Sequence, residues 1–96
     1  VTYASGDSMT PTIPNGAKIV INTKENDYTS LVSGRVYAFS VGNEMICKRA
    51  YKNLDGKLTL MSDNPDKEAN PNRIIDRDCF DMLSLVGRIR MAVIDL

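Results

Sequence analysis

Apolar and polar residues alternate along much of this chain, and such alternation is typical of half-buried β-strands. Residues 35–41 (RVYAFSV) and 44–51 (EMICKRAY) flank Gly42-Asn43, a dipeptide that favours a tight hairpin turn. Asp55-Gly56 in turn predicts a second hairpin, into residues 57–62 (KLTLMS). The middle of the chain is therefore expected to form successive antiparallel strands.

β-branched runs predict further strands nearer the two ends. Residues 17–22 (AKIVIN) follow a Pro-Asn-Gly turn signal, and residues 74–75 form a short Ile-Ile strand. Residues 82–96 (MLSLVGRIRMAVIDL) predict one long strand or two, with Gly87 as a bulge or bend. Residues 63–72 are rich in Asn, Asp and Pro and predict a loop.

Helical periodicity is scarce in this sequence. Residues 76–85, which Asp78 could cap, are the best helical alternative to a strand that starts at Met82. No repeat, linker or low-complexity tract divides the chain. Because the hairpins are local in sequence, we expect residues 1–96 to form a single, mainly β domain. Its architecture would be a small, partly closed β-barrel or rolled sheet of hairpins rather than a parallel α/β fold.

Composition narrows the chemistry that the domain can perform. The 96 residues carry 12 basic and 12 acidic side chains and no histidine. A zero net charge argues against a dedicated nucleic-acid-binding module, which normally has a basic excess. The lack of histidine excludes a Ser-His-Asp triad, a Cys-His dyad and a His-ligated metal site. We expect neither a cofactor nor a metal.

Targeting and redox signals are also few. No apolar run approaches the roughly 18 residues of a membrane helix, and no signal peptide is visible, so we expect a cytoplasmic protein without a membrane contact. The chain does not begin with Met, which suggests a fragment or a processed product. Cys47 and Cys79 have apolar neighbours and are predicted to be two buried, reduced thiols.

One candidate nucleophile lies in residues 6–11 (GDSMTP), where Ser8 sits between a flexible Gly-Asp pair and a proline-containing turn. Such a turn can expose the serine hydroxyl and can aim backbone N–H groups at a developing oxyanion. The commoner explanation, from the residues alone, is that Ser8 merely caps the turn.

Lys48 is the candidate base, because it lies mid-strand between apolar neighbours. Burial against apolar surface lowers the pKa of a lysine, and a neutral lysine can take a proton from a serine hydroxyl. Without histidine, a Ser-Lys dyad is the obvious remaining way to activate a hydroxyl. The commoner explanation is an edge-strand lysine that discourages aggregation. The other lysines occupy more polar or turn-like settings: Lys18, Lys24, Lys52, Lys57 and Lys67.

Together these segments resemble the LexA-like Ser-Lys peptidases, a family that includes LexA, cleavable phage repressors and the UmuD mutagenesis proteins. The resemblance begins with residues 6–16 (GDSMTPTIPNG) and continues at residues 47–49 (CKR). Residues 58–65 (LTLMSDNP) are similar to the family's strand and Asn-Pro turn, and residues 85–89 (LVGRI) to its closing strand. The boxes occur in the family's order and cover nearly the whole chain.

The resemblance implies a peptidase that cleaves its own polypeptide. It makes Ser8 the nucleophile, Lys48 the general base, and the backbone N–H groups of Ser8 and Met9 candidate oxyanion donors. The family usually has Gly-Asp where this chain has Gly16-Ala17, so an acidic residue at the start of the strand is missing. Family members are cut at Ala-Gly or Cys-Gly, and neither dipeptide occurs in these 96 residues. The scissile segment is therefore expected upstream of Val1.

The resemblance also implies a transcriptional repressor. Residues 1–96 would be its C-terminal catalytic and dimerisation domain, and an N-terminal domain and linker outside this chain would bind operator DNA. A RecA filament would stimulate the cut and so relieve repression. The homodimer is expected along the apolar closing segment, residues 83–96, with Arg88 and Arg90 facing solvent or the dimer rim. Alternatively, this segment is simply a central strand.

Three other functions remain open at this point. The domain could dimerise without proteolysis, with relief of repression by an antirepressor protein. It could be a UmuD-like subunit of a translesion polymerase. Bacterial signal peptidases are similar in the same two boxes, but they would need a membrane anchor and an apolar membrane-facing surface.

Overall fold

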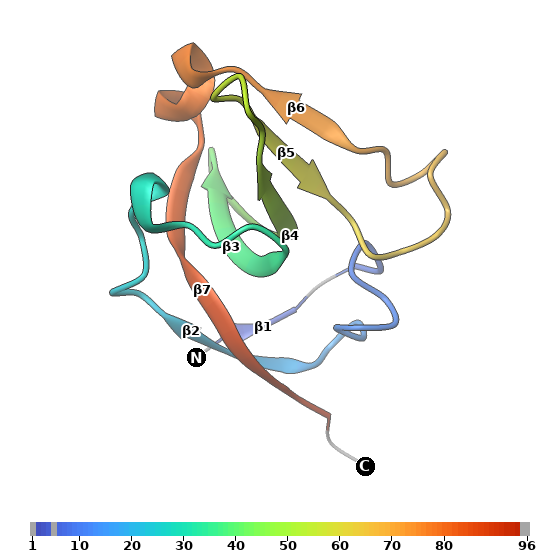
Figure 1. Cartoon of the computed structure of the whole chain (residues 1–96). Helices are drawn as coiled ribbons and strands as arrows, with labels where there is room; N and C mark the ends of the chain where they lie inside the picture. The colour runs from blue at the N-terminus through green and yellow to red at the C-terminus, as the bar shows by residue number, and fades with distance from the viewer. Residues whose placement is uncertain (1, 5, 95–96) are drawn as a thin grey trace.

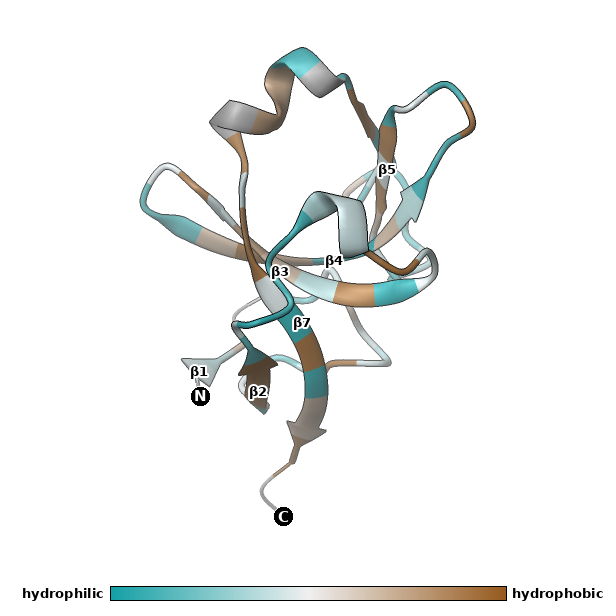
Figure 2. Ribbon diagram, turned by 60° about the vertical axis from the view of Figure 1, so that its left-hand side comes forward, coloured by the Kyte–Doolittle hydropathy of each residue, from teal (hydrophilic) through white to brown (hydrophobic). Residues whose placement is uncertain are grey.

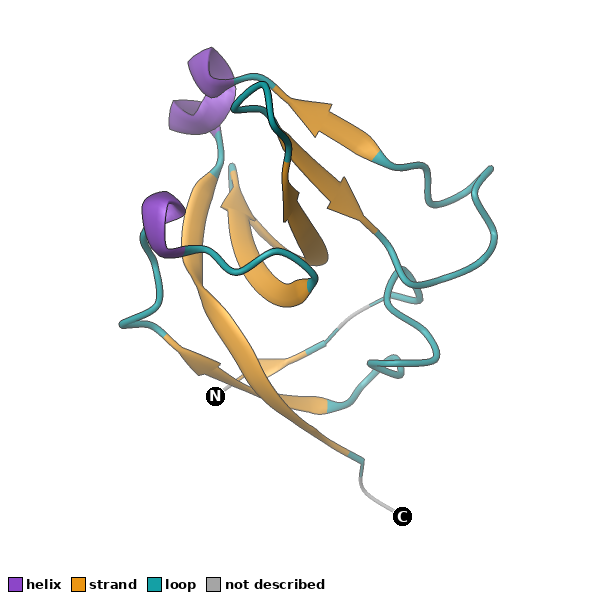
Figure 3. Cartoon of the chain, in the orientation of Figure 1, coloured by secondary structure: helices purple, strands orange, loops and turns teal. Residues whose placement is uncertain are grey.

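The computed structural model describes residues 2–4 and 6–94, which form an antiparallel sheet in the order β1-β2-β7-β3-β4-β5-β6 (Figure 1). The strands are β1 (Thr2–Tyr3), β2 (Lys18–Asn22), β3 (Arg35–Val41), β4 (Glu44–Lys52), β5 (Leu58–Met61), β6 (Arg73–Ile75) and β7 (Ser84–Val93). Two 3-10 helices, η1 (Tyr28–Ser30) and η2 (Arg77–Met82), complete the fold (Figure 3). The sheet rolls up without closing, so the mainly β, partly closed architecture is confirmed.

The predicted hairpins form where the turn dipeptides place them. β3 and β4 pair up to Val41 and Glu44, and Gly42 in the turn between them has a φ of 59°. β4 and β5 are joined by a turn in which Gly56 has a φ of 84°. Glycine adopts a positive φ without steric cost, which explains why these two positions reverse the chain.

β7, near the C-terminus, is a central strand of the sheet. It pairs with β2, near the N-terminus, on one edge and with β3 on the other. Its register with β3 shifts at Val86, beside the predicted bulge at Gly87, and its register with β2 shifts at Arg90. A Cβ on Gly87 would lie 2.4 Å from the carbonyl oxygen of Asn22. Glycine is therefore required where β7 passes from β3 to β2.

The start of the final strand was predicted wrongly. Strand β7 begins at Ser84 rather than at Met82, and residues 77–82 form a 3-10 helix rather than the alternative α-helix. Asp76, and not Asp78, is the N-cap residue, although its side chain makes no capping hydrogen bond. Asp95 and Leu96 of the predicted strand lie outside the described residues.

Aromatic packing explains why this segment is helical. The ring of Phe80 stacks on the ring of Tyr28 with a centroid distance of 4.7 Å. Both rings pack against the larger apolar cluster, and the Tyr28 hydroxyl donates a hydrogen bond to the Leu83 carbonyl. The 3-10 helix before β7 thus places the Phe80 ring against the larger apolar cluster.

Two apolar clusters fill the interior. The larger one lies between β3, β4 and β5 and consists of Leu31, Tyr37, Phe39, Ala50, Leu58, Leu60, Leu83 and Leu85. The smaller one lies under the segment that precedes β2 and consists of Met9, Ile13, Ala17 and Ile19. Ala17, where the resemblance implies an acidic residue, is a buried core residue, 3% exposed.

The cysteine prediction holds only in part. Both thiols are free, but Cys47 is half-buried and Cys79, on η2, is exposed. The 3-10 helix turns the Cys79 side chain outwards, whereas Phe80 packs inwards. In the described part of the chain, no helix is long and apolar enough to cross a bilayer.

Candidate active site

The Ser8 loop is a compact turn anchored on the smaller core cluster. The Thr10 N–H donates to the Asp7 carbonyl at 3.0 Å, and the Ile13 N–H donates to the Met9 carbonyl at 2.9 Å. Met9 and Ile13 are each 3% exposed, whereas Ser8 between the core and solvent is only half-buried. The buried neighbours therefore fix the loop and leave the Ser8 hydroxyl accessible.

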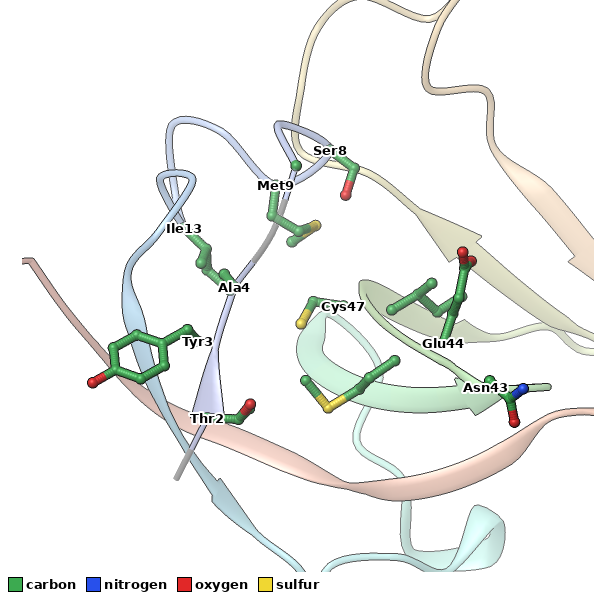
Figure 4. Close-up of a pocket in the computed structure, with 12 residues that line it drawn as sticks. Thr2, Tyr3, Ala4, Ser8, Met9, Ile13, Asn43, Glu44 and Cys47 are labelled. Carbon is green, nitrogen blue, oxygen red and sulfur yellow. The ribbon is translucent and has the colours of Figure 1, made fainter.

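Ser8 and Met9 line a cavity of about 460 Å³ (Figure 4). The Ser8 loop forms one side of this cavity, and the start of β4 with Cys47 and Glu44 forms the facing side. The remaining lining residues are Thr2, Tyr3, Ala4, Gly6, Ile13, Asn43, Met45 and Ile46. The candidate nucleophile thus faces a space large enough for several side chains of a peptide.

Two strand edges border this cavity. Residues 44–48 of β4 pair with β3 on one edge, whereas pairing of β4 with β5 begins only at Arg49. Among the strands that the structure describes, β1 lies at the edge of the sheet and pairs with β2 alone. Both β1 and the first half of β4 therefore carry backbone groups that the sheet does not pair on the cavity side.

Lys48 is half-buried, as the sequence predicts. Its Nζ donates a hydrogen bond of 2.6 Å to the Oγ of Ser62, which is 1% exposed. Burial lowers the pKa of Lys48, and the nearby positive charges of Arg73 and Lys67 lower it further. The environment therefore favours the neutral amine that a general base requires.

The two members of the predicted dyad are both held by the turn of residues 62–64, but the described structure has no hydrogen bond between them. Lys48 is not among the residues that line the Ser8 cavity. Within the described residues, its Nζ is hydrogen-bonded to Ser62 and not to Ser8. The sequence prediction of the Ser8–Lys48 pair therefore stays a prediction.

The turn of residues 62–64, directly after β5, connects the two candidates. The Asn64 N–H donates to the Ser8 carbonyl at 3.0 Å, and the Asn64 side-chain amide donates to the Asp7 carbonyl at 2.9 Å. Asn64 thus holds the backbone on both sides of the Ser8 nitrogen, two residues from the Ser62 hydroxyl that binds Lys48. The sequence analysis included this box in the resemblance but assigned its residues no role.

Asp63 adds a second link between β4 and the Ser8 loop. Its carboxylate accepts two hydrogen bonds from Arg49, at 2.9 and 2.7 Å, and one from the Thr12 hydroxyl at 2.5 Å. The Arg49 hydrogen bonds hold the pKa of Asp63 below its usual value, and the same pairing raises the pKa of Arg49. This ion pair keeps the loop and the strand together.

The candidate oxyanion donors are available. Within the described residues, the backbone N–H groups of Ser8 and Met9 donate to no acceptor, whereas that of Thr10 is used in the turn. Free N–H groups next to a nucleophile can stabilise negative charge that develops on a carbonyl oxygen.

Comparison with known proteins identifies the group to which this site belongs. The family model of peptidase S24-like proteins matches residues 1–90. The chain belongs to the peptidase S24-like family. This assignment confirms the LexA-like resemblance and places the domain in a peptidase class.

A curated relative connects this S24 domain with repression. The repressor protein CI of Enterobacteria phage phi80 is 36% identical over 63 residues, which cover 66% of this chain. The matched region spans only 25% of that relative's length. The similarity supports a repressor-type domain and leaves most of the relative unmatched.

Proposed function

We propose that this S24 domain cleaves the repressor polypeptide to which it belongs, with Ser8 as nucleophile and Lys48 as general base. The observation that carries this proposal is the environment of Lys48, which is half-buried beside Arg73 and Lys67 with a lowered pKa. The Asn64 hydrogen bonds to the Ser8 loop support it, since they keep the nucleophile near the same turn.

The reaction follows from these groups. The Ser8 hydroxyl transfers its proton to the neutral Nζ of Lys48 while Oγ forms a bond to the scissile carbonyl carbon. The N–H groups of Ser8 and Met9 stabilise the oxyanion. The C–N bond then breaks, and the leaving amine takes the proton from the Lys48 ammonium. Water, deprotonated by Lys48, hydrolyses the acyl-serine ester and restores both side chains.

The substrate segment would bind as an added β-strand. The cavity beside Ser8 lies between two unpaired edges, that of β1 and that of residues 44–48 in β4. Such edges recruit an extended peptide through main-chain hydrogen bonds, and the cavity then selects its side chains. A linker upstream of Val1, with a small residue at the cut, would satisfy this geometry.

The biological setting of this proposal is a cytoplasmic repressor. An N-terminal domain would bind operator DNA, and residues 1–96 would dimerise it, which raises operator affinity through effective concentration. Cleavage, stimulated by a RecA filament, would separate the DNA-binding heads from the dimer and end repression. The similarity to the phi80 repressor supports this setting.

The dimer surface that we propose lies in the closing segment, residues 83–96, at its exposed residues 91–94, because Leu83 and Leu85 belong to the larger core cluster. Beyond Arg88, β7 pairs with β2 on one edge only, and apart from Arg90 the residues from Ile89 to Ile94 are apolar (Figure 2). Met91 is 57% exposed, and Val93 and Ile94 are exposed as well. Arg90 binds Glu25 through two hydrogen bonds, at 2.9 and 2.8 Å, and leaves the apolar positions uncovered.

A charge on this segment tests the dimer. Met91→Asp places a carboxylate on the proposed interface and should weaken dimerisation by at least about tenfold, measured by analytical ultracentrifugation. Leu54→Asp, at an exposed turn position outside the segment, is the matched control and should dimerise normally. Equal dimerisation of both variants would place the interface elsewhere.

Cleavage itself is tested in the complete gene product, incubated with RecA filaments and, separately, at rising pH. The wild-type protein should be cut faster as pH rises, because Lys48 must lose its proton. Ser8→Ala and Lys48→Ala should stay intact, whereas Lys57→Ala, which removes an exposed lysine, should be cut like the wild type. Cutting of either dyad variant at the wild-type rate would refute the assignment.

The second candidate is a dimerisation domain that does not cleave. It is favoured by one contact, the hydrogen bond from the Lys48 Nζ to Ser62 instead of to Ser8. In this case an antirepressor protein would relieve repression, and the wild-type protein would stay uncut under both conditions.

A further inference from the structure

Ser62 is the most deeply buried polar residue of the described chain. It is 1% exposed, directly follows β5, and its hydroxyl meets the Nζ of Lys48 at 2.6 Å. A buried hydroxyl without a partner is costly, so this contact fixes both groups. Sequence similarity alone assigns no function to this position.

We propose that Ser62 is a positioning residue that holds the Lys48 amine where it can reach the Ser8 hydroxyl. This inference deepens the proposed self-cleavage and rests on it. Ser62 does not touch the substrate; it acts through the lysine.

The need for such a residue follows from the lysine side chain. Four flexible bonds carry the Nζ, and an amine without an anchor would sample many rotamers at a considerable entropic cost to catalysis. A neutral amine has two N–H bonds and one lone pair. One N–H bond donated to the Ser62 Oγ leaves the lone pair free to accept the proton of Ser8.

The position of Ser62 is itself held from two sides. The Nζ of Lys67 donates to the Ser62 carbonyl at 2.5 Å. Two residues further on, the Asn64 N–H donates to the Ser8 carbonyl at 3.0 Å. The base and the nucleophile loop are thus spaced by one short turn, which is a rigid way to set their separation.

The chemistry of the Ser62 side chain also suits a base. The charged or titratable groups around Lys48 are Arg73 of β6, Lys67 of the loop, Cys47 on its own strand, and Tyr37, its cross-strand neighbour on β3. None of these is a carboxylate. A neutral hydroxyl orients the amine without stabilising its protonated form as strongly as a carboxylate would.

Three variants of the complete protein separate this role from a structural one. Ser62→Ala should lower the cleavage rate at high pH by about tenfold to a hundredfold, because the amine loses its anchor. Ser62→Thr keeps a hydroxyl and should restore most of the rate. Ser33→Ala removes a hydroxyl that binds the Lys52 N–H at the far end of β4, and should change nothing.

A further variant, Ser62→Asp, should shift the pH dependence of the cleavage rate. Its carboxylate would favour the ammonium form of Lys48, so half-maximal cleavage should shift to higher pH, whereas in Ser62→Ala it should shift to lower pH. Misfolding alone lowers the rate without opposite shifts of the midpoint. Cleavage by Ser62→Ala at or above the wild-type rate would overturn the proposal, since Ser62 would then restrain the lysine.

A readout without cleavage separates the two proposals. The Lys48 side chain, isotopically labelled and followed by NMR, should titrate at a lower pH in Ser62→Ala and at a higher pH in Ser62→Asp than in the wild type. If the wild type is never cut, the proposed function fails while this titration still tests the contact. If the three midpoints coincide, Ser62 does not control Lys48.

Discussion

Lys48 and Arg49 are adjacent cations on one strand with opposite environments. Lys48 donates to a neutral, buried hydroxyl, and its pKa is lowered by burial and by neighbouring positive charges. Arg49 donates twice to the Asp63 carboxylate and once to the Gly34 carbonyl, and its pKa is raised. Both side chains are half-buried, and burial lowers the pKa of each, but in Arg49 the hydrogen bonds to Asp63 outweigh burial. The charge of the partner therefore decides the direction of the pKa shift: the pKa is lowered beside the neutral Ser62 hydroxyl and raised beside the Asp63 carboxylate.

The strand itself separates the two environments. Successive side chains of a β-strand point to opposite faces, so neighbours in sequence meet different partners. Pairing with β5 also begins at Arg49, so Lys48 is the last residue of β4 beside the unpaired edge. A lysine with a lowered pKa can therefore lie next to a salt-bridged arginine without sharing its carboxylate.

The largest expected effect comes from giving position 48 the chemistry of position 49. Lys48→Arg should reduce self-cleavage by at least about a thousandfold, because a guanidinium does not lose its proton at any usable pH. Arg49→Lys, which keeps a cation beside Asp63, should retain cleavage. A gel assay of the complete protein compares the two, and a cleaving Lys48→Arg protein would exclude Lys48 as the base.

The second largest effect is expected when the carboxylate that forms the salt bridge with Arg49 is removed. Asp63→Asn should lower the free energy of unfolding by about 1–2 kcal/mol, since it breaks a paired, partly buried bridge. Urea unfolding at neutral pH measures this loss. Asp76→Asn is the matched control, because its bridge to Lys57 is exposed on both sides and should contribute little.

Acid provides an independent check of the same bridge. The pKa of Asp63 is lower in the folded chain than its usual value of 3.8, so its contribution is complete above that value. It is lost as pH falls through the folded pKa. The stability difference between wild type and Asp63→Asn should therefore shrink in strong acid, and a constant difference would contradict the ion pair.

In the alkaline range, the contribution of Lys48 to stability should also rise with pH. Its folded pKa lies below the usual 10.5, so the unfolded chain binds the proton more tightly between those two values. By linkage, the stability that this group contributes rises with pH across that window. Urea unfolding of wild type and Lys48→Met should show the wild type gaining relative stability as pH rises, and parallel curves would refute the lowered pKa.

The smallest effect concerns Cys47, which lies on the cavity side of the same strand. Burial raises the pKa of the Cys47 thiol, so it should react more slowly with a thiol reagent than the exposed Cys79. Mass spectrometry after partial labelling measures both reaction rates, and Cys47 should react about severalfold more slowly than Cys79. A faster Cys47 would mean that the cavity is more open than described.

The hairpins of this fold could be predicted from the sequence because each depends on a local turn. Gly42-Asn43 and Asp55-Gly56 carry their own backbone preference, and the strands that flank them pair as expected. The position of β7 between β2 and β3 depends on contacts distant in sequence, which periodicity does not reveal. The helical start of that segment depends on the Phe80–Tyr28 stack, which is equally non-local.

The candidate site likewise contains residues that the sequence could predict and residues that only the tertiary structure reveals. Ser8 and Lys48 could be proposed from the residues because a chain without histidine has few ways to activate a hydroxyl. Ser62 could not, since a single serine after a strand carries no distinctive pattern. Its role depends on the approach of β4 to β5 and on the depth to which both side chains are buried.

The turn of residues 62–64 has a further consequence for how activity is lost on heating. Its hydrogen bonds reach Lys48, Arg49 and the Ser8 loop from three consecutive residues of the connection that follows β5, not from the strands of the core. Local segments of a protein open at lower free energy than the whole molecule. If Ser8 and Lys48 react as proposed, cleavage should therefore cease at temperatures where the sheet is still intact, because opening of residues 62–64 would separate the two groups.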